Sequence, residues 1–270
     1  MTKIGSHFFD IGYMDTLALG DSPLHRLDPR AKLITTLAFI VTVVSFDKYA
    51  FSALIPFFIF PIVQISVGGL PIGYLLRKVL LVSPFAVLIG IFNPLMDREI
   101  FFQIGSINVS GGWLSFFSIL TRFLLTVTAA LILITTTGFN AVCPALARLG
   151  VPRPFVVQLM FLYRYLFVLT DEAARMVRAI SLRSFNSSGI GFKTFVSMMG
   201  HLLLRTMDRA QRIHLAMLCR GFDGHIRIIR SMKIGYKEIV FAISWSVLFV
   251  ILRCYNMPKM LGALVTGFFG

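Results

Sequence analysis

Residues 113–138 read WLSFFSILTRFLLTVTAALILITTTG, a long apolar run in which Arg122 is the single charged side chain. About 20 apolar residues in a helix are enough to cross the hydrocarbon core of a bilayer. Across the 270 residues of the chain, 57% are apolar and 14% are charged, whereas soluble proteins carry about 25% charged residues. The segment and the composition together predict an all-α integral membrane protein.

Further apolar segments bring the expected number of transmembrane helices to about five. Prolines interrupt two of these segments, and because proline lacks an amide proton we expect kinked helices there. The shorter segments need tilt or flanking residues to cross the bilayer. Besides 113–138, the predicted spans are 33–46, 50–69, 79–96 and 239–255.

Basic residues decide the expected orientation. The stretch 139–238 holds 15 Lys and Arg against 5 Asp and Glu, and such an excess marks cytoplasmic segments. With residues 1–31 also cytoplasmic, four crossings within 32–138 return the chain to the cytoplasm where the basic stretch begins, and 239–270 forms a C-terminal membrane segment. Residues 154–170 are also apolar, but a crossing there would place the basic stretch outside. We therefore expect a helix lying within or just beneath the membrane.

Two helix boundaries and one repeat organise the basic stretch. Gly150, followed by Pro152 and Pro154, predicts that one helix ends and another begins. Further on, DEAARMVRAISLRSF at 171–185 aligns without gaps on DRAQRIHLAMLCRGF at 208–222, with six of fifteen positions identical. These segments predict two long cytoplasmic helices that are copies of one pattern.

Four of the repeated residues follow steps of four, which places them in a row along one side of a helix. An acidic residue opens each row and an arginine closes it, an order that suits the helix dipole if each helix begins at its acidic residue. We therefore expect helices that start at 171 and 208. The rows are Asp171, Arg175, Ala179 and Arg183 in the first copy, and Asp208, Arg212, Ala216 and Arg220 in the second.

The duplicated helix ends favour one of two interpretations. A single such helix is most simply an amphipathic helix with solvated arginines. Two equivalent ends suggest a partner with two equivalent sockets, such as a pair of related subunits. Arg183 with Ser184, and Arg220 with Gly221, suit such a role because a guanidinium can bind a carboxylate through two hydrogen bonds and the small residue permits close approach.

These residues resemble a known family. The segment LDPRAK at 27–32, the turn LGVP at 149–152 and the two arginine motifs are similar to the transmembrane T component of energy-coupling factor transporters, specifically the CbiQ type of cobalt or nickel systems. The resemblance spans most of the chain. The sequence AMLCRGFDG at 216–224 is its most specific part.

The resemblance implies a set of partners. In that family two coupling helices end in Ala-Arg-Ser or Ala-Arg-Gly triplets that dock on two ATP-binding, CbiO-like subunits, which places Arg183, Ser184, Arg220 and Gly221 in those roles. Leu182 and Cys219 stand where alanine is commonest. The resemblance also implies a CbiM-like substrate-binding membrane subunit with a small CbiN-like accessory protein, in the cell (inner) membrane of a bacterium or archaeon. A vitamin-type T component is the alternative.

Other classes of function lack support in the sequence. Clustered carboxylates, a nucleophile and a nucleotide-binding motif are absent, so we expect a non-catalytic subunit without a cofactor, with ATP and magnesium on its partners. The five histidines are scattered and predict no metal site. A secondary transporter would show repeated membrane halves. The net charge of +14 does not indicate nucleic acid, because the basic residues follow the membrane topology.

The three cysteines and the arginine within a span are expected to have structural or contact roles. Cys143, Cys219 and Cys254 have no paired spacing and are expected to be packing residues. Arg122 lies within a span, where a charge is costly and needs a partner. Pairing with a backbone carbonyl or snorkelling, and contact with the substrate-binding subunit, remain equally open.

Overall fold

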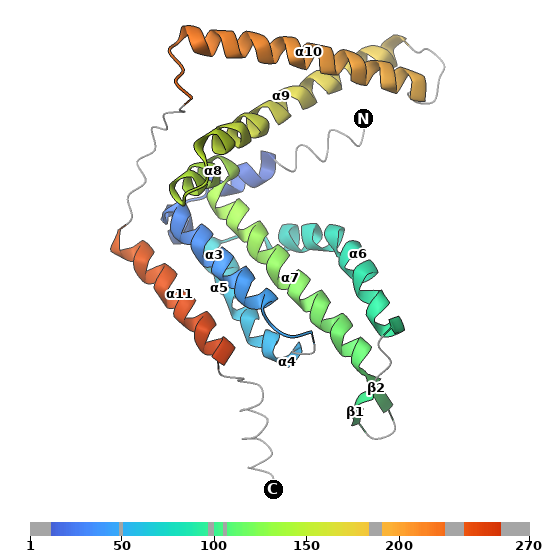
Figure 1. Cartoon of the computed structure of the whole chain (residues 1–270), viewed down its shortest axis with the longest axis vertical. Coiled ribbons are helices and arrows are strands. Elements are labelled where there is room, and N and C mark those ends of the chain that lie inside the picture. The colour runs from blue at the N-terminus through green and yellow to red at the C-terminus, as the bar shows by residue number, and fades with distance from the viewer. Residues whose placement is uncertain are drawn as a thin grey trace. The chain divides into compact units, whose positions relative to one another are not determined.

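The computed structural model describes residues 12–48, 51–96, 100–104, 107–183, 191–224 and 235–254. Helices dominate these residues (Figure 1), which confirms the expected all-α membrane class. A hairpin of two short antiparallel strands, which sequence reasoning did not anticipate, joins α6 to α7. The elements are α2 (Pro23–Arg26), α3 (Pro29–Val44), α4 (Phe51–Leu54), the 3-10 helix η1 (Ile55–Phe58), α5 (Ile59–Gly68), α6 (Ile72–Met96), β1 (Ile100–Ile104), β2 (Ile107–Ser110), α7 (Gly111–Thr137), α8 (Phe139–Arg148), α9 (Arg153–Arg183), α10 (Phe192–Cys219) and α11 (Tyr236–Cys254).

Four helical segments among the described residues are long and apolar enough to cross a membrane: Phe51–Gly68, Ile72–Pro94, Gly111–Thr137 and Arg153–Arg183. The first three overlap predicted spans. The other two predicted spans form α3 and α11. Helix α3 has 16 residues, about 24 Å at 1.5 Å per residue, which is shorter than a hydrocarbon core of about 30 Å. Helix α11 carries charged residues near both of its ends.

The chain divides into two compact units, which we describe separately. The large unit comprises Met14–Gly138 and Met232–Gly270, and the small unit comprises Met1–Tyr13 and Phe139–Ser231. The boundary between Gly138 and Phe139 separates α7 from α8. The long helices α9 and α10 therefore belong to the small unit.

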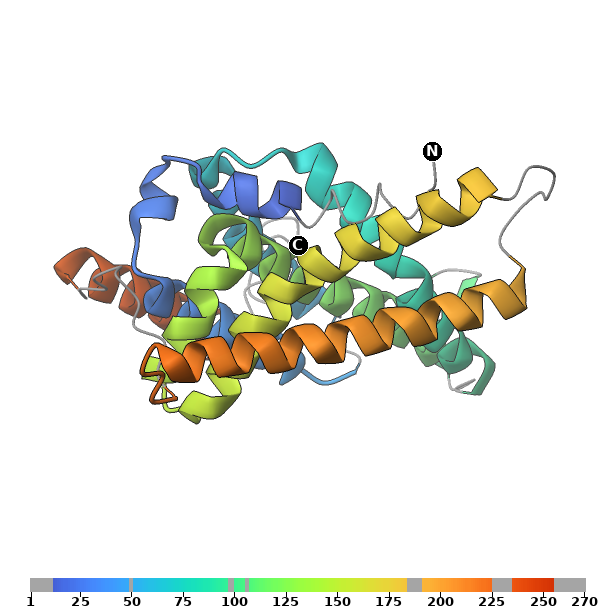
Figure 2. The same ribbon diagram turned by 90° about the horizontal axis from the view of Figure 1, so that it is seen from above.

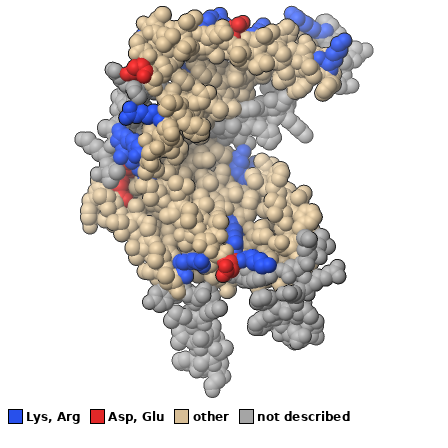
Figure 3. Space-filling model, in the orientation of Figure 1, with Lys and Arg blue, Asp and Glu red and all other residues tan. Residues whose placement is uncertain are grey.

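Aromatic rings form the core of the large unit. Phe39 from α3 stacks on Phe60 from α5, with ring centroids 4.5 Å apart, and Phe249 from α11 lies 5.3 Å from each of them. Leu125 and Ala129 place α7 against the same cluster. Most of the outer surface visible in Figure 3 carries neither Lys and Arg nor Asp and Glu. Such a surface suits contact with lipid, which is as apolar as the side chains.

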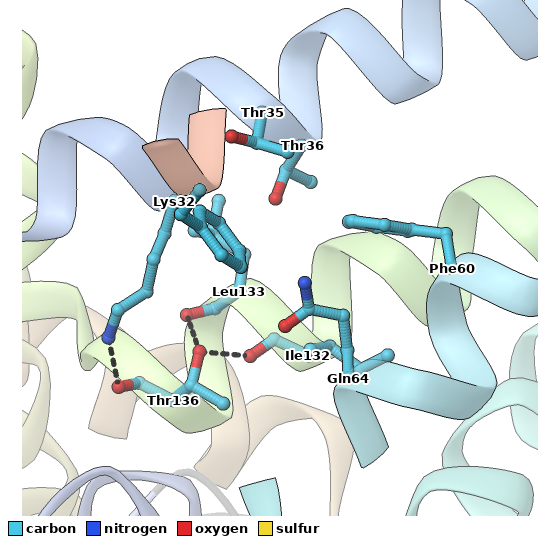
Figure 4. A pocket seen from close by; sticks show the side chains of 9 residues that line it. Lys32, Thr35, Thr36, Phe60, Gln64, Ile132, Leu133 and Thr136 are labelled. Atoms are coloured by element: carbon cyan, nitrogen blue, oxygen red, sulfur yellow. Dashed lines mark hydrogen bonds between the residues drawn. The ribbon is translucent and has the colours of Figure 1, made fainter. Parts of the chain in front are cut away.

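The segment LDPRAK begins α3 and attaches it to α7. Asp28 is the N-cap, and its carboxylate accepts a hydrogen bond of 2.9 Å from the backbone amide of Arg30. Lys32 is buried, and its ammonium donates to the carbonyl oxygen of Thr136 at 2.9 Å (Figure 4). Thr136 lies in the last turn of α7, where carbonyls lack intrahelical partners and attract cations. Lys32 thus caps the end of α7 just before Gly138.

His25 supports the same junction. Its Nε2 donates to the carbonyl of Leu17 at 3.0 Å, so Nδ1 is the acceptor of a 2.6 Å hydrogen bond from the hydroxyl of Ser22. Burial lowers the pKa of His25, and the positive charge of Lys32 lowers this pKa further. The neutral imidazole is therefore favoured, and it can keep both hydrogen bonds.

Replacing Asp28 tests the attachment of α3. Asp28→Ala removes the N-cap acceptor and should lower the free energy of unfolding by about 1 kcal/mol, or the thermal midpoint in detergent by about 2–4 °C. Asp28→Asn is the matched control, because it keeps the acceptor and loses the charge 3.9 Å from the guanidinium of Arg30. Equal losses in both variants would assign the effect to that charge and contradict the capping role.

Candidate functional site

The chain between α8 and α9 turns at Gly150, as the sequence predicted. Gly150 has a φ of 104°. This backbone conformation favours glycine, because a Cβ atom on any other residue would clash. The amides of Gly150 and Val151 donate to the carbonyls of Ala147 and Leu146, the pattern of a Schellman helix end. Helix α8 therefore ends at Arg148 and α9 begins at Arg153.

The repeated segments are the second halves of longer helices, so the expectation that helices start at Asp171 and Asp208 was wrong. Helix α9 begins at Arg153 and α10 at Phe192. The residues before each repeat include no proline after the first turn and continue the helix. The acidic residues therefore lie mid-helix, away from the positive end of the dipole.

The arginines, by contrast, lie where the helices end. Arg183 is the last residue of α9, and Arg220 is the C-cap of α10. Helices α9 and α10 cross, and their C-terminal ends lie at opposite ends of the pair (Figures 1 and 2). Both arginines are exposed. We call these two helix ends the arginine tips.

The tip at Arg220 has a defined shape. Gly221 has a φ of 74°, and its amide donates to the carbonyl of Leu218 at 3.0 Å, while the amide of Phe222 donates to the carbonyl of Met217 at 3.0 Å. The sequence Arg-Gly-Phe thus encodes a Schellman motif. At the other tip, Ser184 and Phe185 lie outside the described residues.

The remaining repeated residues form exposed rows on the two helices, but their contacts differ. The guanidinium of Arg175 binds the carboxylate of Glu172 at 2.6 Å, whereas Arg212 donates to the backbone carbonyl of Asp208 at 3.3 Å. The similarity of the two rows is therefore in position rather than in local contacts. All eight row residues are exposed: Asp171, Arg175, Ala179, Arg183, Asp208, Arg212, Ala216 and Arg220. Their surfaces are accessible to a partner.

Sequence reasoning missed Glu172, which joins the two helices. Its carboxylate binds the guanidinium of Arg205 on α10 at 2.6 Å, as well as Arg175 on its own helix, and Arg209 lies 3.9 Å away. The spacing of Glu172 and Arg175 is visible as a helical pair at three residues. The partner on α10 follows 33 residues later, and no local pattern reveals it.

An apolar stripe lies on α10 away from its contact with α9. Its residues recur at three, four, seven or eight positions and so share one helix face, while Arg205, Arg209 and Arg212 lie on the opposite side. Lys and Arg also gather over α10 along the upper edge of Figure 3. The stripe consists of six large side chains that are each at least half exposed: Phe192, Val196, Leu203, Met207, Leu215 and Leu218.

Arg122 has the carbonyl partner that was one of its two open interpretations. Its guanidinium donates to the carbonyl of Asp47, beyond the end of α3. Arg253 of α11 donates to the carbonyl of Ser45 at 2.9 Å and lies 4.2 Å over the ring of Phe46. Two arginines from different helices therefore hold the turn that follows α3.

The cysteines fit the packing interpretation in one case of three. Cys143 is buried, and burial raises the pKa of its thiol to about 11. Cys219 and Cys254 are exposed, so the expectation that they pack was wrong. Cys219 precedes the Arg220 tip, where side chains point to solvent. Within the described part of the chain, no group of three or more His, Cys, Asp or Glu is placed to hold a metal ion.

Comparison with known proteins identifies the class and then the family. The relatives include the energy-coupling factor transporter transmembrane protein EcfT of Bacillus subtilis, 28% identical over 220 residues, which cover 76% of this chain and 82% of that protein. The EcfT of Thermosediminibacter oceani is 26% identical over 222 residues, covering 76% and 82%. An uncharacterized protein of Methanocaldococcus jannaschii is 26% identical over 228 residues, covering 81% and 77%. The chain is therefore a multi-pass transmembrane T component of the energy-coupling factor class.

The family follows from a second comparison. Residues 20–232 match the family model CbiQ, described as a cobalt transport protein. The match includes the LDPRAK segment, the small-unit helices and both arginine tips. This chain belongs to the CbiQ family.

Substitution of Gly221 tests the shape of the second tip. Gly221→Ala forces an L side chain into the left-handed region, at a cost of about 1–2 kcal/mol. The amides of Gly221 and Phe222 should then exchange hydrogen about 5- to 30-fold faster, measured by mass spectrometry. Gly221→Asn is the control, because asparagine tolerates this conformation better. Unchanged exchange in the alanine variant would contradict the motif.

Proposed function

We propose that this chain is the coupling subunit of an ATP-driven importer for cobalt or nickel ions, with the two arginine tips docked on two ATP-binding subunits. The observation that carries the proposal is the pair of exposed arginines at the ends of two crossing helices. Each guanidinium presents several N–H donors at a helix end, which suits a carboxylate in a groove of the partner. Two tips match two related subunits.

The apolar stripe on α10 supports a second partner. Large apolar side chains on one exposed face mark an interaction surface when they are contiguous. We assign this face to the membrane-embedded substrate-binding subunit, which is apolar itself. Closure of the ATP-binding subunits would move the tips, and α9 and α10 would transmit that movement to the substrate-binding subunit. ATP hydrolysis and its magnesium would belong to the partners, and this chain would act without a catalytic site or cofactor of its own.

The ion substrate is proposed from the family description, which names cobalt transport. The EcfT relatives carry no substrate in their names, so a T component of a vitamin importer is the competing function. The basic stretch 139–238 supports a cytoplasmic position for both tips and, with four crossings before it, a cytoplasmic N-terminus. A CbiM-like subunit with a CbiN-like accessory protein is the expected membrane partner.

Loss of both tips should prevent docking. A partly buried ion pair that loses one partner costs roughly 3–5 kcal/mol, so Arg183→Ala with Arg220→Ala should weaken binding of the ATP-binding subunits by at least about 100-fold. Affinity pull-down in detergent and substrate uptake in proteoliposomes measure the loss. Arg178→Ala is the matched control, because this arginine is exposed on α9 five residues before the tip. Normal assembly and uptake in the double variant would refute the docking.

The membrane partner decides the substrate. Purification of the complex with its partners, followed by identification of the membrane subunit by mass, should yield a CbiM-like protein. Proteoliposomes containing that complex should take up radioactive cobalt in an ATP-dependent manner, and excess nickel should compete. Uptake of a vitamin, without uptake of either ion, would establish the competing function.

A further inference from the structure

We propose that Glu172 is the positioning residue that fixes the spacing and the direction of the two arginine tips. It is the acidic side chain at the contact of α9 with α10, where it binds Arg205 at 2.6 Å and Arg175 at 2.6 Å. Its side chain is 13% exposed, whereas those of Arg205 and Arg175 are 63% and 56% exposed. The carboxylate therefore lies in the contact, and the arginines reach it from outside.

Few fully buried side chains lie on the two helices that cross. Among the described residues, Val156 is the buried residue of α9, 16 residues before Glu172, and Met198 is that of α10, seven residues before Arg205. The ion pair of Glu172 with Arg205 is a specific polar contact at the crossing.

Helix geometry links this contact to both tips. Arg183 follows Glu172 by 11 residues, which is about three turns and about 16 Å of helix, so both residues lie on one side of α9. Arg220 follows Arg205 by 15 residues, about four turns and about 22 Å, and lies on nearly the same side of α10. A change of angle at the crossing is therefore enlarged at the tips, which lie at opposite ends of the pair (Figure 2).

The charges around Glu172 are unbalanced, and this gives the proposal a specific prediction. One carboxylate faces three arginines, since Arg209 lies 3.9 Å away in addition to the two partners. Neutralising Glu172 leaves like charges on both helices at the crossing, which repel each other. Neutralising Arg205 removes one attraction and also one of the repelling charges. Glu172→Gln should therefore disturb the crossing more than Arg205→Gln.

A distance measurement between the tips tests the inference directly. Spin labels at the native Cys219 and at Leu182→Cys report the spacing, because Cys219 is exposed and Leu182 is 76% exposed. Cys254→Ser removes the other exposed thiol, and Cys143 is buried. The full chain in lipid nanodiscs should give one narrow distance distribution by pulsed electron resonance.

The variants have ordered outcomes. Glu172→Gln should broaden the distribution most and Arg205→Gln less, while the reciprocal swap of Glu172→Arg with Arg205→Glu should restore a narrow one. Asp21→Asn is the matched control, since it removes an exposed carboxylate from a surface pair with Arg26. An unchanged distribution in Glu172→Gln, or a swap as broad as the single variants, would overturn the proposal. If Glu172→Gln does not fold, Arg205→Gln supplies the test, because the side chain of Arg205 is exposed and its replacement leaves Glu172 in place.

A transport measurement adds the functional consequence, which rests on the proposed docking of the tips. Glu172→Gln should still bind the ATP-binding subunits, because both arginines remain, but uptake per ATP hydrolysed should fall by about fivefold or more. The reciprocal swap of Glu172→Arg with Arg205→Glu should restore the uptake per ATP hydrolysed. If the wild-type chain fails to bind ATP-binding subunits, the proposed function is rejected, whereas the distance distributions still decide the role of Glu172.

Discussion

Unpaired carbonyl groups at helix ends set the charge pattern of the large unit. A helix leaves its last four carbonyls without intrahelical partners, and within a membrane there is little water to satisfy them. Cationic side chains fill this need at two helix ends. Lys32 donates to Thr136 at the end of α7, while Arg253 and Arg122 donate to Ser45 and Asp47 beyond the end of α3. Three cations of the large unit thus lie where α7 and α3 stop.

The small unit follows a different rule. Among the described residues, its aromatic contacts join Phe139 of α8 to Tyr163 and Phe167 of α9, and most residues of α10 are exposed. Its shape depends on helix ends closed by Gly150 and Gly221 and on the carboxylate of Glu172. Such contacts fix the ends of long helices without covering their faces. The face of α10 turned away from α9 therefore remains accessible.

Local patterns predicted what depends on neighbouring residues. The break at Gly150, the helix end at Arg220 and three of the apolar helices follow from residues within one or two turns. The dipole argument placed a separate helix start at Asp171, although no proline or glycine lies between Pro154 and that residue, and the helix expected over 154–170 runs on through the repeat. The contact of Glu172 with Arg205 and that of Arg253 with Ser45 join residues 33 and 208 positions apart. No periodicity encodes such pairs, so they required the fold.

The hydrogen bond between Lys32 and Thr136 also constrains the order of events during synthesis, because it joins residues 104 positions apart. The carbonyl of His25, at 3.4 Å, is another acceptor of the Lys32 ammonium. The ammonium group leaves the ribosome long before the Thr136 carbonyl exists, and burying an ammonium before its hydrogen bonds are complete is costly. Lys32 must therefore stay hydrated at the membrane surface until the end of α7 has been translated. The contact between the start of α3 and the end of α7 consequently forms late, and a nascent chain that ends before Thr136 cannot form it.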